Sequence, residues 1–264
     1  MRNLLNYIIV IIFASILSSC RISNSTAKED LTSDDHWVSI FNGTNLDDWK
    51  VKIKNHPLDD NWKNTFIVVD SAIRVDYSSY DTFDESYGHI FYKNPYSNYR
   101  LKLQYRFIGE QVPGGAGWAQ RNSGVMIHCQ APETMELNQD FPTSLEVQLL
   151  GGLIEGEERS TGNLCTPGTH VVMDNELVTT HCIGSSSGTY YSDKWVDLEV
   201  VVWNDSIISH YIDGKKVIEY TKPVISGDDT ELNTTGLSPL KKGFISLQSE
   251  SHSVEFKNIM LLEL

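Results

Sequence analysis

The chain has 264 residues, and its 21 Lys and Arg against 35 Asp and Glu leave a formal net charge of −14. This acidic balance argues against a nucleic-acid partner, because phosphates attract clustered Lys and Arg side chains. A hydrophobic content of 40% is enough for a packed core, so a globally disordered chain is excluded. The 18 Gly, 6 Trp and 12 Tyr are typical of a strand-and-turn protein that could stack sugar rings.

Residues 1–19 have the organisation of a secretory signal peptide. Arg2 supplies the positive start, and Tyr7–Ala14 forms an apolar run that is too short and wrongly flanked for a membrane span. The segment Leu17-Ser18-Ser19-Cys20 resembles the bacterial lipobox, in which the cysteine is acylated and becomes the new N-terminus. We therefore expect lipidation at Cys20. Simple secretion, with an unrelated cysteine at this position, is the alternative.

The segment that follows is polar and without periodicity, and residues 20–36 are predicted to be a flexible tether. No aspartate follows Cys20 directly, so retention in the inner membrane is not indicated. We expect an exported protein in the bacterial cell envelope, at the outer membrane, that contacts the bilayer through its lipid anchor alone. Residues 37–264 show no internal repeat and no shift in composition, which predicts a single domain.

Three further cysteines remain in the domain. Cys165 and Cys182 flank a predicted hairpin that turns at Asp174-Asn175, and a disulfide across so short a loop could contribute about 3 kcal/mol in an oxidising compartment. Cys129 falls in an apolar alternation and is predicted to be a buried free thiol. The alternative is a zinc site without a paired Cys-x-x-Cys, and its histidine ligands would be His128, His170 or His181.

Short runs of alternating apolar and polar residues, punctuated by turn residues, recur along the domain. They predict strands at Phe66–Val69, Ala72–Val75, Tyr99–Phe107, Val125–Gln130, Leu145–Leu149, Trp195–Trp203, Ile207–Ile212, Lys216–Tyr220, Phe244–Gln248 and Val254–Leu264. No amphipathic helix interrupts them. About a dozen strands without helices exclude a parallel α/β sheet and favour an all-β, two-sheet antiparallel sandwich.

Two consecutive predicted strands carry polar side chains on one face. In the first strand the apolar residues occupy positions 125, 127 and 129, and in the second they occupy positions 145, 147 and 149. The residues between them point the other way. If the strands pair, one sheet face carries a cluster of Asn122, His128, Glu146 and Gln148. A carboxylate among hydrogen-bonding groups is a plausible base, whereas a solvated outer face is the structural alternative.

The familiar sandwich glycosidases offer a test of this cluster. Retaining hydrolysis needs two carboxyl groups roughly 5–5.5 Å apart. Laminarinase-like enzymes place acids at the first, third and sixth positions of one strand motif. Here these positions are Glu146, Gln148 and Gly151, of which the first alone is acidic. Ordinary retaining hydrolysis is therefore disfavoured at this stage.

Five motifs, in order along the domain, carry a resemblance to a known family. They are Ile40-Phe41-Asn42-Gly43-Thr44-Asn45-Leu46-Asp47-Asp48-Trp49, Asn122-Ser123-Gly124-Val125, Glu146-Val147-Gln148-Leu149-Leu150, Asp213-Gly214-Lys215-Lys216-Val217, and Gly243–His252 with Val254–Ile259. With them the chain resembles the 3-keto-disaccharide hydrolase domain family. The resemblance implies a concanavalin A-like jelly roll and activity on an oligosaccharide or glycoside.

The implied chemistry needs one base. A ketone at C3 of a sugar acidifies the proton on C2, and its removal gives an enolate that can expel the C1 substituent; water can then complete net hydrolysis. We expect Glu146 to be the base and His128 an acid/base or metal ligand, while Gln148 and Asn122 orient hydroxyl groups. A divalent metal ion could stabilise the enolate. No compact ligand motif demonstrates one, so the cofactor stays open.

Other polar and aromatic residues are weaker candidates for substrate binding. Trp118 follows a glycine-rich loop and could stack a sugar ring or plug local packing. His181 lies in the segment bounded by the cysteine pair, while Glu250 and His252 alternate with Gln248 near a strand end. Two other functions remain open. One is a non-catalytic, lectin-like glycan-binding module, and the other is a structural lipoprotein that docks a partner on its sheet face.

Overall fold

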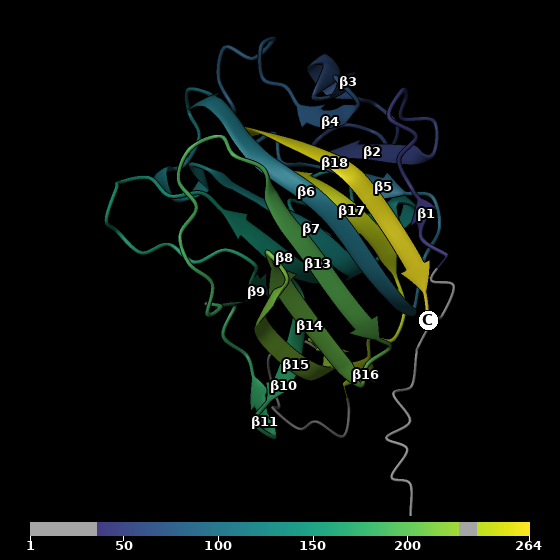
Figure 1. The fold of residues 1–264 in the computed structure, drawn as a ribbon. Helices are drawn as coiled ribbons and strands as arrows, with labels where there is room; N and C mark the ends of the chain where they lie inside the picture. The colour runs from purple at the N-terminus through teal and green to yellow at the C-terminus, as the bar shows by residue number, and fades with distance from the viewer. Residues whose placement is uncertain (1–35, 227–236) are drawn as a thin grey trace, which may run out of the picture. The chain divides into compact units, whose positions relative to one another are not determined.

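The computed structural model describes residues 36–226 and 237–264 as two antiparallel β-sheets packed face to face (Figure 1). The all-β sandwich predicted from the sequence is confirmed. The signal peptide, Cys20 and the tether up to residue 35 lie outside the described residues, so their roles stay predictions. Within the described ranges no helix is long and apolar enough to cross a membrane. Short 3-10 turns occur at η1 (Trp62–Asn64), η2 (Gly117–Ala119) and η3 (Pro132–Thr134).

The larger sheet has the strand order β11-β10-β15-β14-β13-β6-β18-β4-β3. The bounds are β3 (Phe66–Val69), β4 (Ala72–Val75), β6 (Asn98–Gln111), β10 (Thr169–Met173), β11 (Glu176–Val178), β13 (Val196–Trp203), β14 (Ile207–Ile212), β15 (Lys215–Ile225) and β18 (His252–Glu263). Two short strands flank it, β1 (Val38–Ser39) against β18 and β16 (Ser238–Pro239) against β15. Its three tight hairpins turn at Asp70-Ser71, Asp174-Asn175 and Asp213-Gly214, where both central residues have positive φ.

The smaller sheet carries the polar cluster predicted from the sequence. Its strand order is β12-β9-β8-β7-β17-β5-β2. The bounds are β2 (Trp49–Ile53), β5 (Gly88–Tyr92), β7 (Asn122–Cys129), β8 (Leu145–Leu150), β9 (Asn163–Cys165), β12 (Cys182–Ile183) and β17 (Phe244–Ser249). Glu146 on β8 lies opposite Met126 on β7, and Gln148 lies opposite Gly124. The pairing of these two strands thus agrees with the sequence analysis.

Apolar side chains from alternate strand positions fill the space between the sheets. Leu101 and Tyr105 of β6 belong to this core together with Val125, Val147 and Leu247 of the smaller sheet. A second, separate apolar cluster lies on the other face of the smaller sheet. It consists of Phe91, Met126, Cys129 and Met135, with Phe141 and Phe244 packed against it. The loop between β7 and β8 contributes Met135 and Phe141, so part of this outer face is covered by protein and is dry.

The structure corrects the predicted direction of two side chains at the end of β7. His128 has a positive φ of 50°, and the register between β7 and β17 shifts at this point. Its Nε2–H donates to the carbonyl of Asn204, in the turn after β13 of the other sheet, so His128 lies between the sheets and away from Glu146. Cys129 is turned to the opposite face, beside Met126. A β-bulge breaks the two-residue period, and counting alternate positions across it is therefore wrong.

Candidate active site

A glycine on the adjacent strand leaves room for the side chain of Glu146. Gly124 pairs with Gln148 on the adjacent strand, and a Cβ atom at Gly124 would lie 2.6 Å from Oε1 of Glu146. The carboxylate therefore lies directly over the glycine backbone. A glycine inside a strand often marks such a close approach. The glycine between Ser123 and Val125 in a predicted strand region is the signal in the sequence that could have indicated this approach.

Glu250 comes from the turn that joins β17 to β18 and thereby connects the two sheets. The next residue, Ser251, has a positive φ of 79°. Its N–H donates to the Tyr77 hydroxyl at 2.8 Å, and its carbonyl accepts from the Val112 N–H at 3.0 Å. These bonds fix the turn, and Glu250 is 3% exposed. The position of Glu250 is therefore set by the backbone around it.

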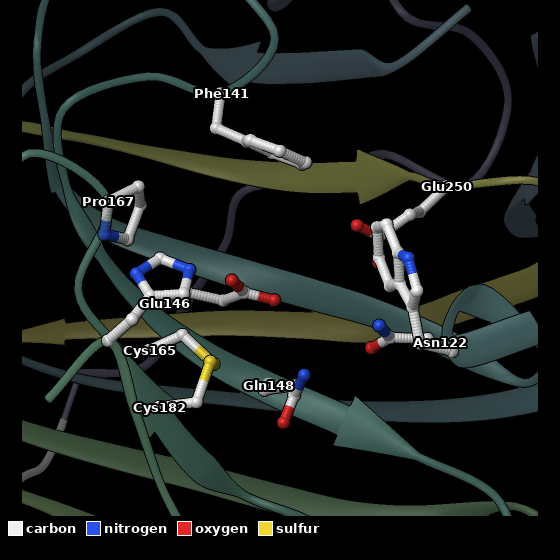
Figure 2. A pocket seen from close by; sticks show the side chains of 10 residues that line it. Asn122, Phe141, Glu146, Gln148, Cys165, Pro167, Cys182 and Glu250 are labelled. Atoms are coloured by element: carbon white, nitrogen blue, oxygen red, sulfur yellow. A yellow bond between two sulfur atoms is a disulfide. The ribbon is translucent and has the colours of Figure 1, made fainter. Parts of the chain in front are cut away.

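Glu146 and Glu250 meet at one cavity of about 310 Å³. Figure 2 shows both carboxyl groups, with the amides of Asn122 and Gln148, directed into it. The lining residues are Trp118, Asn122, Phe141, Glu146, Gln148, Cys165, Pro167, His181, Cys182 and Glu250. Six of the residues predicted from the sequence for catalysis or binding therefore come together here. Phe141 and Pro167 were not predicted, since nothing in a loop sequence shows which sheet face the loop will cover.

The disulfide between Cys165 and Cys182 forms part of the cavity wall. Cys165 on β9 pairs directly with Glu146 on β8, so the bond stands beside the carboxylate (Figure 2). His181 precedes Cys182, and its carbonyl accepts hydrogen bonds from the backbone N–H and the hydroxyl of Thr166. The remaining cysteine of the domain, Cys129, is free and buried.

Burial shifts the protonation equilibria of both carboxyl groups. It raises the pKa of Glu146, and it raises the pKa of Glu250 with a further contribution from the charge on Glu146. The buried Glu255 provides a contrast, because Arg74 and Arg106 form ion pairs with it at 2.5 and 2.7 Å. Among residues 36–226 and 237–264, no cation contributes to the pKa shift of either cavity carboxyl group, and Oε2 of Glu250 has no hydrogen-bond partner there. Burial and the mutual repulsion of the two carboxylates therefore both oppose ionisation of the pair.

Amide groups beside the carboxyl pair are available to a ligand. Nδ2 of Asn163 donates to Oε1 of Gln148 at 3.1 Å, an arrangement that leaves the Gln148 NH₂ group free to donate into the cavity. Oδ1 of Asn122 is buried without a partner, as are both amide atoms of Gln248 on β17. Buried polar atoms are normally hydrogen-bonded. Among the residues that line the cavity, Oδ1 of Asn122 and Oε2 of Glu250 are such unpartnered atoms in the described structure, and they indicate a site for a bound polar molecule or water.

Two predicted site residues do not line the cavity. His128 lies between the sheets, as described above. His252 begins β18 and packs edge-on against Phe107 with ring centroids 5.7 Å apart, and burial lowers its pKa to about 4. The change of sheet after Glu250 separates His252 from the cavity, which a simple alternation from Gln248 does not anticipate. Glu250 therefore takes the place beside Glu146 that was predicted for His128.

The donor set does not match a three-ligand metal site. Within residues 36–226 and 237–264, no group of three or more His, Cys, Asp or Glu side chains is arranged to hold a metal ion. The cavity itself offers two carboxylates and amide oxygens.

The two sheets and their polar cavity define a concanavalin A-like sandwich. A "putative glycosyl hydrolase" from Parabacteroides distasonis has this fold, with 20% identity, 86% of this chain and 99% of that chain covered, and a TM-score of 0.52. A Bacillus licheniformis β-glucanase is similar at 11% identity, with coverage of 86% and 97% and a TM-score of 0.50. No curated protein matches the sequence.

Residues 36–262 match the 3-keto-alpha-glucoside-1,2-lyase-like domain, and the chain belongs to this family. The family resemblance seen in the sequence is thereby confirmed. Membership places the domain among carbohydrate-active proteins.

Proposed function

We propose that the protein cleaves 3-keto-glycosides, with Glu146 removing the proton at C2 of the keto-sugar. The observation that carries the proposal is the pair of buried carboxyl groups, Glu146 and Glu250, at one cavity whose lining, in the described part of the chain, includes no Lys or Arg. Such a pair can present one ionised base and one protonated acid at the same time. Membership of a family named for 3-keto-glucoside lyases supports the choice of substrate.

The reaction needs one proton removed and one supplied. The ionised Glu146 takes the C2 proton, and the electron pair of that C–H bond becomes part of an enolate with the C3 ketone. The enolate then expels the C1 substituent and forms a C1=C2 double bond. The protonated Glu250 gives its proton to the departing oxygen. Water can add across the enone at C1 and C2, which completes net hydrolysis.

The amide groups in the cavity can stabilise the developing negative charge and orient the sugar ring. Developing negative charge on the ketone oxygen needs a preorganised donor. The Gln148 NH₂ group is such a donor, because its carbonyl is already held by Asn163. The unpartnered Oδ1 of Asn122 can accept a hydrogen bond from a sugar hydroxyl. These contacts orient the ring so that C2 faces Glu146.

The carboxyl pair also makes ordinary retaining glycoside hydrolysis a second candidate. The strand motif disfavoured it, but Glu250 supplies a second carboxyl group from another strand end. A retaining nucleophile must stay ionised, normally through a polar, hydrogen-bonded environment. Burial raises the pKa of both groups here. A shared proton therefore fits acid/base chemistry better than nucleophilic attack.

Release of the leaving group tests the proposal. The wild type and the Glu146→Gln variant are incubated with a 3-keto-glucoside and with the unoxidised glucoside, with and without chelator. We expect turnover of the keto-sugar alone, and a loss of about 10²–10⁴-fold in the variant because the general base is removed. Glu176→Gln, exposed on β11, is the matched control and should behave as wild type. Hydrolysis of the unoxidised glucoside would favour the retaining route, and glycan binding without turnover would favour the lectin-like alternative.

A further inference from the structure

The cavity is lined by a disulfide, by a loop and by an exposed tryptophan. The disulfide and Pro167 form one wall, and Phe141 forms another. Phe141 belongs to the loop between β7 and β8, which is fastened to the sheet edge at Leu137. The carbonyl of Leu137 accepts from Nζ of Lys52 at 3.0 Å and from the N–H of Asn55 at 2.7 Å. A sugar ring held among the polar groups is thus enclosed by a disulfide and by an anchored loop.

Trp118 stands where the lining becomes exposed to solvent. It is 56% exposed, whereas Glu146 is 7% exposed. Its indole is nearly parallel to the ring of Tyr87, with an interplanar angle of 15° and ring centroids 6.5 Å apart. A tryptophan that plugged local packing would be buried. The exposed indole instead presents an aromatic surface beside the cavity.

The guanidinium group of Arg159 contacts the turn that carries Trp118 through several backbone carbonyls. Nη1 of Arg159 donates to the carbonyls of Gln120 and Gly151, each at 2.7 Å, and Nη2 donates to the carbonyl of Trp118 at 3.2 Å. Arg159 thereby fastens the η2 turn to the end of β8, the strand that bears Glu146. Burial lowers the pKa of Arg159, with a further contribution from the charge on Arg121. The hydrogen bonds to backbone carbonyls offset the cost of burying the guanidinium group.

We infer that Trp118 is a subsite for ring-bearing leaving groups, and that Arg159 is the residue that positions it. The assignment rests on the proposed function in one respect, namely which end of the substrate lies where. C1 is the neighbour of C2, so a sugar whose C2 faces Glu146 has its leaving group at the same cavity, and the exposed Trp118 is a lining residue that a group too large for the cavity can reach. A flat aglycone or a second sugar ring can then stack on the exposed indole. A methyl group is too small to use this surface.

Ligand binding tests the subsite without any need for turnover. Dissociation constants of phenyl and methyl α-glucoside are measured by calorimetry in the Glu146→Gln background, with and without Trp118→Ala. We expect tighter binding of the phenyl glucoside, and a preference that falls about 3- to 10-fold when the indole is removed. Trp203→Ala, which removes an exposed tryptophan on β13, is the matched control and should leave the preference unchanged. An unchanged preference in Trp118→Ala, or no binding of the phenyl glucoside, would overturn the assignment.

The positioning role of Arg159 is tested with a separate variant. Arg159→Met should reduce the same phenyl-over-methyl preference, and the variant lacking both side chains should lose no more preference than Trp118→Ala alone. Equal weakening of both glucosides by Arg159→Met would mean a general structural role and would contradict positioning. Thermal unfolding of each variant checks that the domain is folded.

Turnover separates this inference from the proposed function. The selectivity for phenyl over methyl leaving groups is compared between wild type and Trp118→Ala with the corresponding 3-keto-glucosides. A protein that binds the phenyl glucoside through Trp118 but cleaves no keto-sugar would refute the proposed function and keep the subsite. A protein that cleaves keto-sugars with a selectivity independent of Trp118 would refute the subsite and keep the proposed function.

Discussion

Gly124 determines where the Glu146 carboxylate can lie. Because a Cβ at this position would be 2.6 Å from Oε1, Gly124→Ala must displace the carboxyl group, which is the flexible end of its side chain. A displacement of about 1 Å can cost on the order of 10²-fold in rate. We therefore expect kcat on a 3-keto-glucoside to fall by at least about 10-fold, with a smaller change in KM.

The matched control for this prediction is Gly188→Ala. No atom lies within 4 Å of a Cβ built at Gly188, so the substitution should leave steady-state kinetics unchanged. Wild-type kcat in Gly124→Ala would show that the exact place of the Glu146 carboxylate does not matter for turnover.

Individual site residues were predictable wherever the strand period is regular. Glu146 and Gln148 were placed on one face by simple alternation, and the structure places both at the cavity. His128 was misplaced because a β-bulge with positive φ has no obvious signature in its side chain. Glu250 was suggested by alternation along β17, but its approach to Glu146 depends on how distant strands pair. A single sequence does not encode that pairing in a readable way.

At the scale of elements, the disulfide ties β9 to β12 beside the active carboxylate. Replacing both Cys165 and Cys182 by serine should cost about 3 kcal/mol, because a short loop is no longer closed in the unfolded chain. The melting temperature should fall by roughly 6–12 °C for a domain of this size. Binding of a glucoside should also weaken, since the bond forms a cavity wall.

Reductant provides the internal control for the disulfide. It should lower the melting temperature of the wild type towards that of the double variant, and it should leave the double variant unchanged. Equal melting temperatures for the oxidised wild type and the double variant would show that the disulfide does not stabilise the domain.

Strands were easiest to predict where the turn between them contains residues that are typical of tight hairpins. The hairpins at Asp70-Ser71, Asp174-Asn175 and Asp213-Gly214 use residues that tolerate positive φ. A hairpin was predicted at the second of these turns, and strands were predicted on both sides of the other two. β5 was missed because its five residues are all buried, so no polar alternation marks it. Strands covered on both faces lose the period-2 signal on which such predictions depend. β2 was missed although its sequence, Trp49-Lys50-Val51-Lys52-Ile53, alternates apolar and polar residues.

For the whole molecule, the buried carboxyl pair predicts an unusual pH dependence of stability. A carboxyl group whose pKa is raised by folding binds its proton more tightly in the folded state. The free energy of unfolding therefore decreases as pH rises from the unfolded value, about 4.3, to the raised folded value, by about 1.4 kcal/mol for each pKa unit. Burial raises the pKa of Glu146 in this way. Glu146→Gln should thus be more stable than wild type, by a margin that grows between about pH 5 and pH 8.

Urea unfolding of wild type and Glu146→Gln across this pH range measures the margin. The two proteins should converge near pH 4, where the carboxyl group is protonated in both states. A margin that shrinks as pH rises would mean that Glu146 is stabilised as a carboxylate, contrary to its environment in the structure.

The fate of the C2 hydrogen tests the central claim most directly. A 3-keto-glucoside carrying deuterium at C2 is cleaved by the protein, and the sugar product is analysed by mass spectrometry beside a buffer-only sample that measures spontaneous exchange. Proton abstraction by Glu146 breaks the C2–D bond, so we expect deuterium to be lost from C2 and a primary isotope effect on the rate when that step limits turnover. A sugar product that fully retains its C2 deuterium, formed without any isotope effect in single-turnover cleavage, would contradict the account, because direct displacement at C1 leaves that bond intact.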